Sequence, residues 1–103
     1  MTDAYEGQGS FEWDPDKAKR NFGKHRVTFE EALSAFRDPF ALTVDDPDHS
    51  EAEDRLILMG LSERGRLLVV VYVERGETLR LISARVAEPD EKREYEEEPG
   101  YGF

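Results

Sequence analysis

The chain has 103 residues, of which 38% are hydrophobic and 37% charged, which is enough for one small domain with a single core. Its 14 basic and 24 acidic side chains give a formal net charge of −10, which excludes bulk attraction to nucleic acid or to an anionic membrane but allows a local basic cleft. Because there is no cysteine, disulfides, thiol nucleophiles and the common structural zinc sites are excluded.

We divide the chain into a flexible lead-in over residues 1–10, one domain over residues 11–98 and a tail over residues 99–103. No apolar run approaches the ~20 residues that a membrane-spanning helix needs. Residues 1–10 also lack the basic and apolar regions of a secretory signal. We therefore expect a soluble, cytoplasmic protein that does not contact membranes.

The domain is predicted to begin with a short strand over residues 11–13, where apolar and polar side chains alternate. A first helix follows at once, because Asp14 suits the N-cap and Pro15 the first helical position, where its missing N–H group costs nothing. The expected apolar face of this helix consists of Ala18, Phe22 and His25.

A second helix is predicted to begin with a capping box at Thr28 and Glu31 and to end at residues 38–39. Four strands are then predicted, at residues 40–44, 55–61, 67–74 and 78–86. The short turns between the last three demand antiparallel neighbours. A last helix within residues 90–98 has Tyr95 as its main apolar anchor. The predicted fold class is α+β: N-terminal helices, a four-stranded antiparallel sheet and a C-terminal helix.

The side chains that could carry chemistry are lysines, arginines, histidines and tyrosines. The sequence has no Gly-rich phosphate loop and no HExxH pair, and His25 and His49 lie far apart, so we predict neither a metal site nor a cofactor. Arginine and lysine can stabilise the charge that builds on phosphorus during RNA cleavage, and histidine can move the 2′-hydroxyl proton. On spacing alone, His25 better fits a partly buried residue that completes the apolar face of the first helix and interacts with its C-terminus.

A resemblance adds to these observations. Residues 11–25 (FEWDPDKAKRNFGKH) and 27–32 (VTFEEA) strongly resemble the opening of the BrnT family, the toxins of type II toxin–antitoxin systems. Further matches are residues 46–50 (DPDHS), Glu53, Arg55, Gly60, residues 82–85 (ISAR), Ala87, Glu91, Tyr95 and Glu96. The resemblance spans residues 11–97 and implies a compact RelE-like fold with a ribonuclease activity that arrests translation.

The resemblance also implies partners and site residues. The partners are an RNA substrate and a BrnA-type ribbon-helix-helix antitoxin. This chain would contact operator DNA only through that antitoxin. A higher-order toxin–antitoxin oligomer is compatible with these partners. The expected catalytic residues are Lys24, His25, Arg55, Arg85 and Tyr95. In this scheme Arg55 and Arg85 bind phosphate, Lys24 stabilises developing charge, His25 acts as acid or base, and Tyr95 positions a base or hydroxyl. Expected RNA-binding residues are Arg80, Arg66 and Lys92, and further candidates are His49, Glu53 and Glu91.

The chain departs from the family pattern in two places. Arg26 stands where the family usually has the glycine of a left-handed helix end. Family members commonly begin the last helix with a basic cluster, but residues 88–91 here are Glu-Pro-Asp-Glu. Carboxylates near a phosphate path weaken RNA affinity. The alternative function is therefore an interaction module with weak or no nuclease activity that binds the antitoxin and takes part in operon autoregulation.

Overall fold

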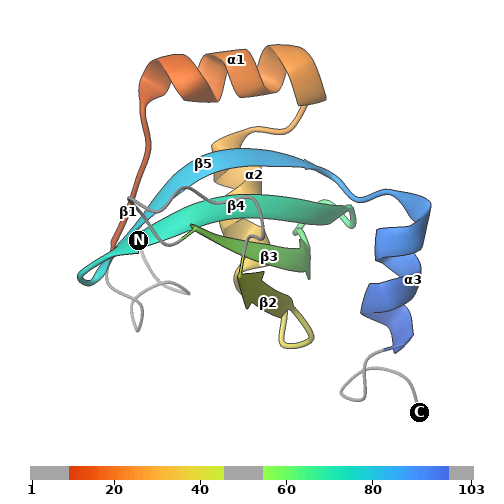
Figure 1. Ribbon diagram of the computed structural model, residues 1–103. Helices are drawn as coiled ribbons and strands as arrows, with labels where there is room; N and C mark the ends of the chain where they lie inside the picture. The colour runs from red at the N-terminus through yellow and green to blue at the C-terminus, as the bar shows by residue number, and fades with distance from the viewer. Residues whose placement is uncertain (1–9, 46–54, 98–103) are drawn as a thin grey trace.

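The computed structural model describes residues 10–45 and 55–97, which form helices on both sides of one sheet (Figure 1). The elements in chain order are β1 (Ser10–Glu12), α1 (Pro15–His25), α2 (Phe29–Ala35), β2 (Leu42–Asp45), β3 (Arg55–Leu61), β4 (Leu67–Arg75), β5 (Thr78–Val86) and α3 (Pro89–Glu97). The α+β class is confirmed, although α2 ends earlier than predicted and β2 begins later. Within the described ranges, no helix is long and apolar enough to cross a membrane.

The sheet is five-stranded and mixed, which corrects the prediction of a four-stranded antiparallel sheet. Its strand order is β1-β5-β4-β3-β2, and β1 pairs with β5 in parallel, with Phe11 opposite Leu79. The other neighbouring strands are antiparallel, as predicted. A parallel pair needs a long crossover connection rather than a tight turn. The turn lengths that predicted the antiparallel strands therefore carried no information about where β1 pairs.

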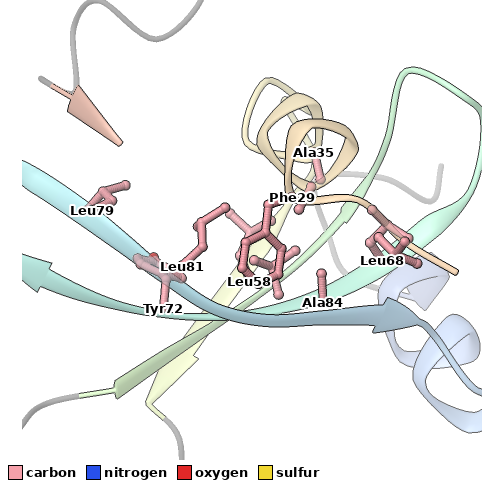
Figure 2. Close-up of a cluster of buried hydrophobic side chains, with 11 residues drawn as sticks. Phe29, Ala35, Leu58, Leu68, Tyr72, Leu79, Leu81 and Ala84 are labelled. Atoms are coloured by element: carbon pink, nitrogen blue, oxygen red, sulfur yellow. The ribbon is translucent and has the colours of Figure 1, made fainter. Parts of the chain in front are cut away.

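Helix α2 packs on one face of the sheet and builds the main core with it (Figure 2). The buried members of this cluster are Val27, Phe29, Ala32 and Ala35 from the α2 region and Leu58, Leu68, Val70, Tyr72, Leu79, Leu81 and Ala84 from the strands. Gly60 of β3 is buried under α2, and a Cβ atom there would lie 2.6 Å from the carbonyl oxygen of Ala35. The close approach of α2 to β3 therefore requires a glycine at this position.

Helix α3 covers the opposite face of the sheet at one end. Tyr95 is buried in a second cluster with Met59, Leu67 and Val69, so its role as the apolar anchor of α3 is confirmed. Its hydroxyl donates a hydrogen bond to the carboxylate of Asp38, which lies in the turn after α2. This bond connects α3 to the turn that follows α2.

The ends of α1 follow the local sequence. The Asp14 side chain accepts a hydrogen bond of 2.8 Å from the backbone N–H of Asp16, so the predicted N-cap is confirmed. Arg26 ends the helix in the left-handed conformation at φ 60°, and its N–H group donates to the carbonyl of Phe22. Its guanidinium lies 4.9 Å from the centre of the Phe22 ring. That contact offsets part of the cost of a non-glycine residue in this conformation.

The predicted apolar face of α1 is wrong in one respect: Phe22 is 41% exposed, and the buried residue of the helix is Asn21. The Asn21 amide nitrogen donates to the carbonyls of Val27 at 3.0 Å and Ala84 at 2.9 Å. Its amide oxygen accepts from the N–H of Ala84 at 3.0 Å. Asn21 thus provides hydrogen-bond partners for the backbone groups of Ala84, on the outer edge of β5 beyond the three residues that pair with β1. Helix α1 covers this part of the edge in place of a strand.

Glu31 does not close the predicted capping box. Thr28 accepts the expected hydrogen bond from the N–H of Glu31 at 3.0 Å, but the Glu31 carboxylate is buried and ion-paired with Arg66. Ser62 also donates to this carboxylate at 2.7 Å. The hydrogen bond from Arg66 lowers the pKa of Glu31 against the opposing effect of burial. Arg66 therefore links the turn before β4 to α2, and its role in the fold was not visible in the local sequence.

Candidate functional site

A shallow cavity lies where α1 meets the outer edge of β5. Its volume is about 370 Å³, and its lining residues are Lys17, Arg20, Asn21, Lys24, His25, Ile82 and Ser83. The basic residues and His25 follow one another at helical spacing, so they share a face of α1. None of the acidic residues within 10–45 and 55–97 lines the cavity. The arrangement suits an anion whose charge is spread over several groups, such as an RNA backbone.

The strand side of this basic cavity is formed by an irregularity in β5. Ser83 is paired with Val71 and Leu81 with Tyr72, so Ile82 is an extra residue in β5. Such bulges redirect side chains at strand edges and next to functional sites. Here the bulge places Ile82 and Ser83 against α1, while Asn21 holds the adjoining Ala84. Sequence reasoning missed Lys17, Arg20, Ile82 and Ser83 as site residues, although the helical spacing of the bases in residues 17–25 was a usable signal.

Three of the predicted arginines lie on the face of the sheet that α3 partly covers. Arg55 and Arg80 are both opposite Val73, on the two sides of β4, so their Cα atoms are about 10 Å apart. Arg85 is on the same face, two residues beyond Ser83 and so about 7 Å further along β5. This arginine face adjoins the basic cavity at Ser83.

Arg85 is engaged by the first turn of α3. Its two terminal nitrogens donate to the two carboxylate oxygens of Glu91 at 2.9 Å and 2.8 Å. These hydrogen bonds lower the pKa of Glu91 and raise that of Arg85. The backbone N–H of Glu88 donates to the same carboxylate at 2.8 Å, so Glu91 also caps the start of α3. The acidic segment at residues 88–91 therefore lies directly against Arg85.

The remaining arginines differ in their partners. Arg80 is ion-paired with Glu12 of β1 at 3.0 Å. Arg66 is held by Glu31 and by the carbonyl of Arg26 at 3.0 Å, away from the arginine face. The Nε atom of Arg55 is buried without a hydrogen-bond partner in the part of the chain that the structure describes. A buried donor of this kind is satisfied if an anion binds beside it.

The other predicted site residues are more scattered. Tyr95 is only 4% exposed and its hydroxyl is bound to Asp38, so it lies apart from the basic cavity. Lys92 is exposed on α3. His49 and Glu53 lie outside the described residues. The structure thus brings Lys24 and His25 together in one cavity and places Arg85 on the adjoining strand. Among residues 10–45 and 55–97, no three His, Asp or Glu side chains are grouped to hold a metal ion.

Comparisons with known proteins agree with this architecture. A family model described as "Ribonuclease toxin, BrnT, of type II toxin-antitoxin system" matches residues 13–91, which is more than half of the chain. Among solved structures, the chain is similar to the crystal structure of the Brucella abortus ribonuclease toxin BrnT, with 26% sequence identity and a TM-score of 0.55. That match covers 78% of this chain and 97% of the Brucella chain. A search of curated proteins found no match.

Proposed function

Because the chain belongs to the BrnT family of ribonuclease toxins of type II toxin–antitoxin systems, we propose that it cleaves RNA without a metal ion and thereby inhibits translation. The observation that carries this proposal is the basic cavity between α1 and β5, where Lys24 and His25 lie side by side with Lys17 and Arg20. In a chain with a net charge of −10, a cavity lined by three bases and, among the described residues, by no acid is well suited to a polyanion.

The chemistry assigned to these residues is attack by a 2′-oxygen on the neighbouring phosphorus. His25 takes the proton from the 2′-hydroxyl, the 2′-oxygen bonds to phosphorus, and the bond to the 5′-oxygen breaks as that oxygen takes a proton from water. Lys24 stabilises the charge that builds on the phosphoryl oxygens. Arg55 and Arg85 hold the flanking phosphates on the arginine face, and Arg80 extends this path along β5.

A type II toxin–antitoxin family implies an antitoxin as partner. We assign to it the BrnA type, with a ribbon-helix-helix part that contacts operator DNA, so that this chain reaches the operator only through the antitoxin. The site of action is the cytoplasm, where RNA and ribosomes are present.

The experiment is cleavage of a labelled single-stranded RNA of mixed sequence by the purified chain, with EDTA present. We expect cleavage to persist in EDTA. His25→Gln should lower the cleavage rate about a hundredfold with little change in RNA affinity, because a general acid or base contributes about that much or more. Lys24→Gln should also lower the cleavage rate, because it removes the charge that stabilises the phosphoryl oxygens in the transition state. The matched control is Lys19→Gln, which removes the same charge from an α1 residue outside the cavity. Cleavage that stops on chelation, or equal effects of the Lys24 and Lys19 variants, would contradict the proposal.

A second candidate function is an interaction module with weak or no nuclease activity. The observation that favours it is the pairing of Arg85 with Glu91, because Arg85 lies only two residues along β5 from Ser83 of the basic cavity. Binding of the antitoxin without measurable RNA cleavage by the purified chain would select this function.

A further inference from the structure

A second cavity, of about 480 Å³, lies on the face of the sheet that carries α2, beside the turn between β4 and β5. It shares no lining residue with the basic cavity. Its walls include Phe36, Leu58, Tyr72 and Leu79. Two glutamates, Glu74 and Glu77, lie on its rim. We call it the acidic cavity.

The walls of the acidic cavity include apolar side chains that are held in place by the main core. Tyr72 and Leu58 are 5% and 6% exposed, and the Phe36 ring meets the Tyr72 ring edge to face with 5.1 Å between centroids. Thr43 also lines the cavity, next to Tyr72. Because these side chains are packed by the core, the cavity is preformed rather than opened by a ligand.

The rim of the acidic cavity carries two carboxylates, those of Glu74 and Glu77. Glu74 and Glu77 are exposed, and neither forms an ion pair within residues 10–45 and 55–97. By contrast, four other glutamates are paired with arginines: Glu12, Glu31, Glu63 and Glu91. Burial raises the pKa of Tyr72, and the nearby negative charge of Glu74 raises it further.

We propose that the acidic cavity receives an arginine or lysine side chain of the antitoxin. The alkyl stem of such a residue would lie on the walls formed by Phe36 and Tyr72, and its cationic head would bind Glu74 and Glu77. RNA is a poor occupant because the two carboxylates repel phosphate. The inference rests on the antitoxin partner of the proposed function and adds a location and a chemistry to that contact.

The test uses the whole 103-residue chain and, as probe, a purified antitoxin of the BrnA type that the proposed function assigns to it. Affinity is measured for the wild type, Glu74→Gln, Glu77→Gln and the double variant. Each single substitution should weaken binding about tenfold, as for a charge-assisted hydrogen bond lost at an interface. Glu77→Arg should weaken it further by repulsion. The matched control is Glu30→Gln, an exposed glutamate of α2 that does not line the cavity, and it should leave affinity unchanged.

Two further measurements separate the possible failures. RNA cleavage by the free chain should be the same in all these variants, since the acidic cavity is separate from the basic one. Wild-type binding with no loss in the Glu74 and Glu77 variants overturns this inference alone. Absence of any complex with the wild type overturns both the antitoxin partner and this inference. A change in the self-association of the chain, without a change in antitoxin affinity, would assign the cavity to a second copy and overturn the inference as well.

Discussion

The pairing of Arg85 with Glu91 predicts that a single neutral substitution will improve RNA binding. In Glu91→Gln the side chain keeps an oxygen that can accept the N–H of Glu88, so the cap at the start of α3 is retained. What is lost is the negative charge that holds Arg85 through two hydrogen bonds. Arg85 then becomes available to phosphate without first leaving a partner.

The size of the effect follows from the exposure of the pair. The side chains of Arg85 and Glu91 are 37% and 26% exposed, so solvent screens their attraction and the pair contributes about 1 kcal/mol or less. RNA that binds Arg85 in the wild type must first break this pair, and in Glu91→Gln it need not. The substitution should therefore raise RNA affinity about fivefold at most. One added phosphate contact should also steepen the dependence of log affinity on log salt by about 0.7 for single-stranded RNA.

The assay is fluorescence anisotropy with a labelled RNA across a range of salt concentrations, together with cleavage rates. Glu96→Gln is the matched control, because Glu96 is an exposed residue of the same helix and forms no described contact with Arg85. Equal gains in both variants would show that general charge, rather than the pair, limits binding. No gain in Glu91→Gln would remove Arg85 from the RNA path.

Two other predictions concern residues that hold the fold. Tyr95→Phe should lower the free energy of unfolding by about 1 kcal/mol through loss of the bond to Asp38, and should leave the cleavage rate of the folded protein unchanged. A hundredfold lower cleavage rate in Tyr95→Phe, at unchanged stability, would contradict this and would show that Tyr95 is a catalytic residue. The pKa of Glu31 is lowered in the fold, so its contribution to stability is present above the unfolded pKa and is lost as pH falls through the folded pKa. Urea unfolding from pH 6 to pH 3 should therefore show a smaller loss of stability in Glu31→Gln than in the wild type, and parallel curves would contradict this.

The starts of the N-terminal helices were determined by the sequence alone. Asp14 and Thr28 each accept a hydrogen bond from an N–H group two or three residues further on, so the information lies within one turn of chain. The antiparallel strands were also predictable, because short turns leave consecutive strands no other neighbour. The family resemblance rests on motifs of the same local kind, and the family match confirms it.

Only the tertiary structure decided which charged side chains are paired with each other and which can bind a ligand. Nothing in the local sequence distinguishes the roles of Arg66, Arg80 and Arg85. In the structure each is paired with a glutamate from a different element. The parallel pairing of β1 and the capture of the β5 edge by Asn21 likewise join segments far apart in the chain. The physical reason is that a buried or half-buried polar group must find its partner in space. Local periodicity specifies which face a side chain occupies, and only the packed sheet specifies what it meets there.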